Sequence, residues 1–149
     1  MAVATGNMRA DTRRLLVTVF RPDSDIPVIK GIWDKKTGGQ LDSEETLYHP
    51  GAMADPESLG GRVTPENITL QRLCKIGRDW RAIPSLMNGV GKSRVTISDE
   101  PMTLEGRTDP ADAHIYAGTL KRVQPPPADS ESSDAALIEI EITIDTWPG

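Results

Sequence analysis

The sequence predicts a mainly β fold with a single helix, and three observations carry that prediction. First, short runs of β-branched or alternating apolar residues recur along the chain, with turn residues between them. Second, every second residue from Ile138 to Ile144 is isoleucine, and Glu139, Glu141 and Thr143 lie between them. Third, a single stretch repeats its apolar residues at helical spacing.

Six strands are expected, at residues 14–20, 26–33, 67–72, 93–98, 115–123 and 137–144. Ile68 and Leu70 alternate with polar neighbours, as do Val95 and Ile97, so these four side chains should face a core. Pro27 must lie at the start of its strand or on a sheet edge, because proline donates no hydrogen bond to a ladder. In the last strand the isoleucines face the core and the carboxylates face water or a partner.

A helix is expected between the third and fourth strands, where apolar residues recur at steps of three and four. The stripe consists of Leu73, Ile76, Trp80, Ile83, Met87 and Val90. Pro84 removes a backbone donor, so we expect either a kink or a helix that covers only part of this window. Gly89 and Gly91 supply its end. Trp80 and Met87 are predicted to lie in the core.

Length and charge restrict the class of protein. The 149 residues suit one domain with one core, and Cys74, the single cysteine, is interpreted as a core side chain. No apolar run approaches the roughly 20 residues of a membrane span, and residues 1–11 lack the apolar segment of a signal peptide. The net charge of −5 argues against a nucleic-acid-binding surface, although DNA could pass such a surface without binding.

No catalytic, cofactor or metal site is predicted. Residues 89–93 resemble the end of a phosphate loop, but Leu86 stands where its first glycine belongs, and a helix precedes where a strand should. His49 and His114 have no partner at metal-ligand spacing. The acidic residues near 42–45 lack the alternating oxygen ligands of a calcium loop and are interpreted as solvated.

Two segments fit poorly into a compact domain. Residues 34–61 are rich in glycine, show no periodicity and carry a net charge of −4 from six acidic and two lysine residues. Residues 125–134 combine a proline run with an acidic, serine-rich tip. Ordering a long loop costs roughly 1–2 kcal/mol per residue, so we expect residues 34–61 to be ordered against another chain.

Several motifs resemble the tail tube (major tail) proteins of phages that infect actinobacteria. They are Gly31-Ile-Trp-Asp-Lys-Lys-Thr-Gly-Gly39, Asp42-Ser-Glu-Glu-Thr46, Tyr48-His-Pro-Gly51, Ser58-Leu-Gly-Gly61, Tyr116-Ala-Gly-Thr-Leu-Lys-Arg-Val-Gln-Pro-Pro126 and Asp129-Ser-Glu-Ser-Ser-Asp-Ala-Ala-Leu-Ile-Glu139. The likeness covers roughly residues 14–145, and its motifs are structural rather than catalytic. It implies a tail-tube-type β-sandwich or β-barrel with one packed helix and a long inter-subunit loop. Six copies would close a ring, and rings would stack into a hollow tube that carries the genome.

The resemblance also implies where contacts form. An N-terminal arm (residues 1–13) and a C-terminal tail (residues 146–149) would flank the β domain at 14–145, and the long loop at 34–61 would contact neighbouring subunits. The candidate interface residues are Trp33, Asp34, Lys35, Lys36, Tyr48 and Trp147. Burial within its own domain is the alternative for Trp33. Glu139 and Glu141 are predicted to line an acidic lumen that repels DNA phosphate.

The expected function is therefore that of a structural virion protein rather than an enzyme, made in the host cytoplasm and located in the tail. Its partners would be copies of itself and other tail proteins such as sheath, baseplate or terminator. One alternative is another ring component of a phage tail or contractile injection system, such as a terminator or a baseplate-proximal ring. The other is a small monomeric β-barrel binding module or enzyme. Whether the tail contracts is left open.

Overall fold

The computed structural model describes residues 13–48, 51, 57–102, 108, 110–128 and 136–148. The strands in chain order are β1 (Arg13–Phe20), β2 (Pro27–Trp33), β3 (Lys35–Gly38), β4 (Leu41–Tyr48), β5 (Glu57–Pro65), β6 (Ile68–Leu73), β7 (Arg94–Pro101), β8 (His114–Gln124) and β9 (Leu137–Thr146). The helical elements are the 3₁₀ turn η1 (Trp80–Ala82), helix α1 (Ile83–Asn88) and the 3₁₀ turn η2 (Pro110–Asp112). The six strands expected from the sequence are confirmed, each within a few residues.

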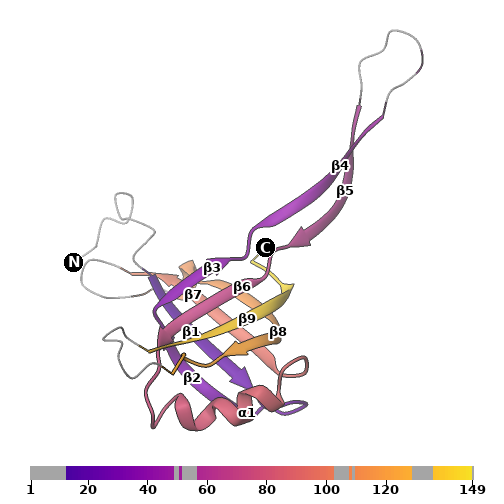
Figure 1. Cartoon of the computed structure of the whole chain (residues 1–149). Helices are drawn as coiled ribbons and strands as arrows, with labels where there is room; N and C mark the ends of the chain where they lie inside the picture. Colours follow the sequence, from indigo (N-terminus) through magenta and orange to yellow (C-terminus); the bar gives the residue numbers. More distant parts are fainter. Residues whose placement is uncertain are drawn as a thin grey trace, which may run out of the picture.

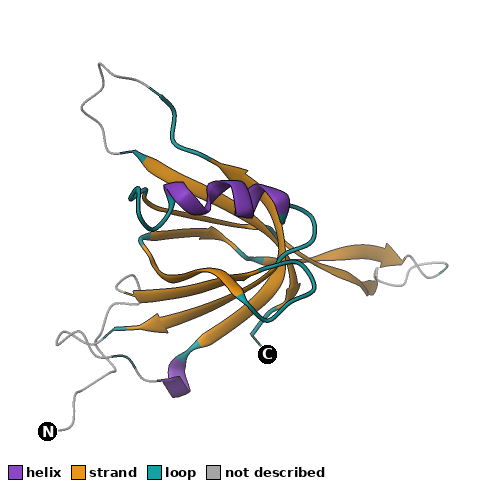
Figure 2. Ribbon diagram, turned by 90° about the horizontal axis from the view of Figure 1, so that it is seen from below, coloured by secondary structure: helices purple, strands orange, loops and turns teal. Residues whose placement is uncertain are grey.

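Seven strands form one antiparallel sheet in the order β2-β1-β7-β8-β9-β6-β3. The sheet curls into a half-barrel, and α1 lies across one end of it (Figures 1 and 2). Its concave face is aliphatic: the four isoleucines of β9 are at most 5% exposed, and Ile68, Leu70, Val95 and Ile97 are at most 1% exposed. The alternation predicted for these strands is thus confirmed, and it is the burial of this face that holds the sheet in its curl.

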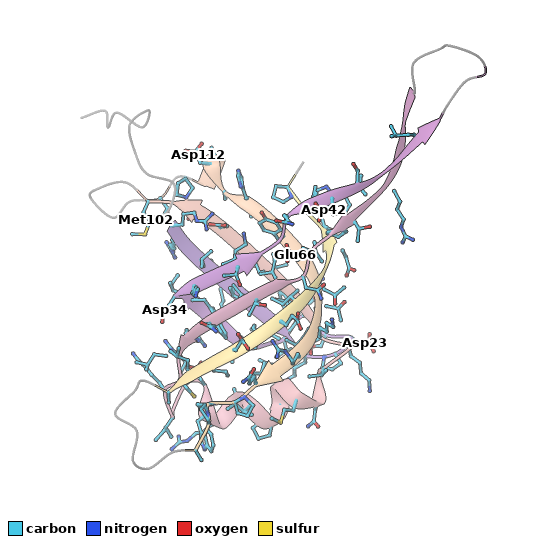
Figure 3. The ribbon with its side chains drawn as sticks, turned by 45° about the horizontal axis from the view of Figure 1, so that its top comes forward. Asp23, Asp34, Asp42, Glu66, Met102 and Asp112 are labelled. Carbon is cyan, nitrogen blue, oxygen red and sulfur yellow. The ribbon has the colours of Figure 1, made fainter. Side chains whose placement is uncertain are left out.

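The two edge strands of the sheet are consecutive in the chain. β2 ends at Trp33 and β3 begins at Lys35, so Asp34 alone carries the chain from one edge to the other. The Asp34 amide donates to the Gln71 carbonyl at 3.1 Å, and its carboxylate accepts from the Leu73 amide at 3.2 Å. Asp34, labelled in Figure 3, therefore ties the corner between β2 and β3 to β6 and to Leu73 at its end.

A second set of contacts, in the interior, holds β2 and β6 together at the same corner; we call this place the seam between β2 and β6. Arg72 of β6 is 1% exposed, stacks over the Trp33 ring at 4.5 Å and donates to the Ile32 carbonyl at 3.3 Å. Its other guanidinium nitrogen forms an ion pair with Asp79, which is fully buried just before η1. Arg72 thus links β2, β6 and the helical segment, although β2 and β6 are not paired with each other in the sheet.

The helix occupies only part of the stretch over which the apolar stripe runs. Of the two expectations, a kink at Pro84 or a shorter helix, the shorter helix is confirmed. Pro84 lies in its first turn, where a missing amide costs nothing, and α1 ends at Asn88 with Gly89 as its cap. The predicted orientation of the stripe is wrong. Ile83 is buried at 6%, but Trp80 is 52% and Met87 46% exposed. Leu86, outside the stripe, fills the core instead, because the short helix turns its 83/86 face inward.

The sequence predicts a long loop without periodicity at residues 34–61, whereas the structure contains strands there. β3 adds to the sheet edge, and β4 and β5 form a two-stranded antiparallel ribbon that projects far from the half-barrel (Figure 1). Gly38 and Gly39 start this ribbon with φ of +87° and +84°. A Cβ on Gly38 would lie 2.1 Å from the Asn67 carbonyl oxygen, so the turn requires glycine. We call residues 41–65 the hairpin arm.

The predicted flanking segments lie mostly outside the described residues. Of the N-terminal arm only Arg13 is described, and it begins β1. Of the 125–134 connection, residues 129–134 are not described. The C-terminal strand continues to Thr146, so the tail expected at 146–149 begins inside β9.

Candidate functional site

The described residues offer little to a metal ion or a nucleotide. No group of three or more His, Cys, Asp or Glu side chains among them could hold a metal. Between α1 and β7, the amides of residues 89–93 all donate within the chain, to carbonyls of Leu86, Met87, Gly89 and Leu120. Those amides are what a phosphate would need, so the interpretation of this segment as a helix end followed by a strand is confirmed.

One polar depression of about 310 Å³ lies beside the β1–β2 turn, lined by Arg21, Asp23, Ser24, Asp25, Lys92 and Arg94. Arg94 pairs with Asp25 at 3.0 Å and stacks on the Phe20 ring at 4.4 Å. Two of the five charged side chains that line the depression, Arg94 and Asp25, are therefore paired with each other. Among the described helices, none is long and apolar enough to cross a membrane.

The convex face around β9 is less acidic than the sequence indicates. Glu139 accepts from the Gln71 side chain at 2.8 Å and from Arg122 of β8 at 3.3 Å. Glu141 pairs with the same guanidinium at 3.5 Å. Arg122 thus sits between both carboxylates, and the three groups carry a net charge of −1. Sequence reasoning missed Arg122 because only the register of β8 against β9, shifted after Leu120, brings it opposite Glu141.

The predicted interface residues divide between the surface and the interior. Asp34, Lys35 and Trp147 are exposed, Trp147 at 37%. Trp33 is only 2% exposed in the single chain. This agrees with the alternative for Trp33, which is burial within its own domain. Tyr48 ends β4, and its side chain lies outside the described part of the structure. The assignment of these residues to a subunit contact stays a prediction.

The Lys36 side chain turns inward in the single chain and is only 7% exposed. It pairs with Asp99 of β7 at 3.2 Å and lies 4.3 Å from the centre of the Tyr116 ring. Arg13 reaches the same Asp99 oxygen at 3.3 Å. Within the single chain, Lys36 therefore holds edge strand β3 to β7 and β8, and its assignment to a subunit contact stays a prediction.

Cys74 follows β6 at the same end of the sheet as the Arg72–Asp79 pair. It is partly buried and packs against the core, in line with the interpretation of its side chain. Burial raises the pKa of its thiol, and the Asp79 carboxylate adds to that shift. A thiol with a raised pKa is a poor nucleophile at neutral pH, so Cys74 has the properties of a packing residue.

Comparisons with known proteins agree on the fold. No family model and no curated protein sequence matches the chain. Solved structures do match: a chain of the anti-feeding prophage tube-terminating cap has a TM-score of 0.65 at 16% identity, covering 99% of this chain and 93% of that one. A chain of the PVC sheath–tube complex in its extended state has a TM-score of 0.66 at 17% identity, covering 98% and 97%. The SPP1 tail tube has a TM-score of 0.59 at 13% identity, covering 95% and 77%.

The structural neighbours are thus tail tube, tube terminator and baseplate proteins of phages and contractile injection systems, which are structural tail components rather than enzymes. The chain has the fold of tail tube proteins: mainly β, a curled half-barrel sheet and a single short helix. At these identities the likeness establishes the architecture alone. The fold class expected from the sequence is confirmed.

Proposed function

We propose that this chain is a subunit of a phage-type tail tube. Copies close into rings of six, and the rings stack into a hollow tube through which DNA is delivered without specific binding. The observation that supports this most is the combination of a curled sheet with a projecting hairpin arm, in a fold shared with tube proteins over 95–99% of the chain. Its place would be the virion tail, after synthesis in the host cytoplasm, and the source an actinobacterial phage.

Ring closure would use features that the single chain leaves unpaired. β2 and β3 are the outermost strands of the sheet, so each has one side without a ladder partner among the residues that the structure describes. Unpaired strand edges promote association with other chains, and a cyclic arrangement gives each edge a defined neighbour. The hairpin arm is a two-stranded ribbon without a sheet beneath it, and such ribbons are at best marginally stable alone.

The convex face of β6, β8 and β9 is the surface we assign to the lumen, including Glu139 and Glu141. Its basic Arg122 is already engaged by both carboxylates, so the face offers phosphate no cluster of unpaired cations there. Binding to DNA needs such clusters, because affinity comes from displacing counterions with Lys and Arg. A lumen of this kind would let DNA slide.

Electron microscopy of the purified protein at rising concentration tests the assignment. Long hollow tubes with regular axial repeats are expected. Isolated rings that never stack would favour the second candidate, a terminator or baseplate-proximal ring, which deserves testing because cap and baseplate chains share the fold. A stable monomer at high concentration would favour the binding-module alternative. Sheath, baseplate and terminator proteins are the further partners we propose for the assembled tube.

A further inference from the structure

A side chain occupies part of the free side of edge strand β2. The Nη1 atom of Arg72 donates to the Ile32 carbonyl at 3.3 Å. In the sheet, β1 is the neighbour of β2, and Arg72 belongs to β6, which is not paired with β2. The guanidinium therefore meets β2 from the side that has no ladder among the described residues. A strand that added to this side would need the same carbonyl as an acceptor for one of its own amides.

The sequence around Ile32 makes room for the guanidinium. At Gly31 a Cβ would lie 3.1 Å from the Arg72 Nη1 atom, which is closer than ordinary van der Waals contact. Glycine in a strand commonly marks such a close approach. On the other side of Ile32, the centre of the Trp33 ring lies 4.5 Å from the Cζ atom of Arg72 and provides a cation–π contact. Residues 31–33 therefore form a fitted site for Arg72 on the strand edge.

Arg72 is held in this position from its other side. Its Nη2 atom forms an ion pair with Asp79, and the two residues are 1% and 0% exposed. Asp79 is itself fixed by the Arg78 side chain, whose Nε atom donates to it at 3.0 Å, and by the Lys75 amide at 3.2 Å. Moving the guanidinium away would separate a buried pair of charges, which is unfavourable. Arg72 is thus a fixed part of the β2 edge.

The rest of the free side of β2 offers little to an incoming strand. Pro27, the first residue of the strand, has no amide hydrogen to donate. Lys30 is exposed, and charged side chains on edge strands disfavour pairing with another chain. At the corner, the Asp34 carboxylate accepts from the Leu73 amide at 3.2 Å, so a donor at the end of β6 is taken as well. Side chains therefore occupy the seam where the backbone of a further strand would have to lie.

The closed seam leaves two buried donors unsatisfied. The Nε1 atom of Trp33 and the Nε atom of Arg72 have no hydrogen-bond partner among the residues that the structure describes. A buried donor without an acceptor lowers stability. The carbonyl groups of an added strand are acceptors of the kind that these donors need. The closed seam therefore has unused bonding capacity that a further strand would fill.

We propose that Arg72, held by Asp79, blocks the free side of β2 against strand pairing with a second copy. Ring closure through β2 then requires that the guanidinium be displaced, so the inference rests on the proposed tube function and adds the control of one of its contacts. The partner is an edge strand of another copy, because the group that Arg72 covers is a backbone carbonyl, and backbone groups of edge strands pair in ladders. The block keeps newly made chains from pairing at random through β2 before they join a tube.

Removing the pair without leaving a buried charge tests the block. The unblocked variant is Arg72→Met with Asp79→Leu. The matched control is Arg94→Met with Asp25→Leu, which removes an exposed arginine–aspartate pair. In sedimentation over a concentration series, the unblocked variant should begin to associate at a concentration roughly tenfold lower than the unaltered protein, because the Ile32 carbonyl is then free to accept from a strand. The control should stay within about threefold of the unaltered protein.

A second variant covers the case in which the double substitution does not fold, as judged by circular dichroism. Arg72→Lys keeps a positive charge opposite Asp79, but its single ammonium group lacks the second nitrogen with which arginine reaches Ile32. This variant should also associate at a lower concentration than the unaltered protein. Hydrogen exchange then locates the contact, because the amides of residues 28–32 should gain protection when the unblocked variants associate.

Two results would overturn the block. One is a folded variant that associates at the same concentration as the unaltered protein, and the other is association without added protection at residues 28–32. The proposed function is judged separately, by whether the unaltered protein forms tubes. If it forms none while the unblocked variants associate through β2, the block on the edge stands and the tube function is wrong. If the unaltered protein forms tubes and the variants behave like it, the function stands and the block is wrong.

Discussion

Replacing Asp79 with alanine should destabilise the chain more than almost any other single substitution at a charged residue. Asp79 is fully buried and pairs with Arg72, which is itself only 1% exposed. Its second oxygen accepts from the Arg78 side chain at 2.9 Å and from the Lys75 amide at 3.2 Å. Alanine would leave the Arg72 guanidinium buried without its counter-charge at the seam between β2 and β6.

The size of the effect follows from that loss. Removing one partner of a buried ion pair costs about 3–5 kcal/mol in the free energy of unfolding, because the remaining charge stays desolvated. For a chain of this length each kcal/mol lowers Tm by roughly 2–4 °C, so Tm should fall by about 6–20 °C. The substitution Asp25→Ala is the control, since Asp25 also pairs with an arginine but its side chain is 94% exposed. It should leave Tm almost unchanged.

Urea denaturation and calorimetry, both run at concentrations where the protein is a single chain, measure these differences. The double substitution Arg72→Met with Asp79→Leu should recover part of the loss, because no unpaired charge then remains in the interior. A loss below about 1 kcal/mol for Asp79→Ala would mean that water or a shifted side chain solvates Arg72, and the reasoning about the seam would be refuted.

The same carboxylate gives stability a pH dependence. Burial alone would raise the pKa of Asp79, but hydrogen bonds from Arg78 and Lys75 and the charge of Arg72 outweigh it and lower the pKa below its ordinary value of 3.8. A lowered pKa in the folded state contributes stability that is present above the unfolded pKa and is lost as the pH falls through the folded one. We therefore expect the Asp79→Asn protein to lose less stability than the unaltered one between pH 5 and pH 2, measured by urea midpoints.

Three further predictions follow from single features of the fold. Gly38→Ala should lower the free energy of unfolding by about 1–3 kcal/mol, because a Cβ there combines a positive φ with a clash against the backbone. Gly77→Ala is the control and should lower it far less, because its Cβ would meet no atom within 4 Å. Chemical denaturation measures both differences. Cys74 should react with a thiol reagent more slowly than free cysteine at pH 7 and equally fast once unfolded, and equal rates in the folded protein would contradict its raised pKa. Glu139→Lys with Glu141→Lys should leave tubes assembled but impede genome delivery, and unchanged infectivity would remove these residues from the lumen.

The sheet was largely predictable because its strands bury one face. The isoleucines of β9 and the pairs in β6 and β7 had to alternate to reach a shared core, and alternation is visible in a sequence. The hairpin arm escaped prediction for the opposite reason. The described side chains of its strands are exposed, apart from the half-buried Pro65, so these residues need no period of two, and the glycines and acidic residues of the arm look like those of a loop.

The helix shows where a periodic pattern misleads. A stripe at helical spacing says that one face is apolar, but it does not say whether that face meets the chain's own core or another chain. Here the stripe of Trp80 and Met87 faces out. The position of the helix was predictable and its orientation was not. Charged pairs such as Arg72 with Asp79 and Lys36 with Asp99 were hidden for a related reason: they depend on which strands meet, and only the tertiary fold determines that.

The central claim is that the chain's free edges and its hairpin arm find their partners in identical copies. Cryo-electron microscopy of the purified protein after concentration tests it most directly. We predict hollow tubes of stacked six-membered rings, with the hairpin arm of each copy in contact with a neighbouring copy. A monodisperse single chain under the same conditions, with the arm free in solution, would contradict it.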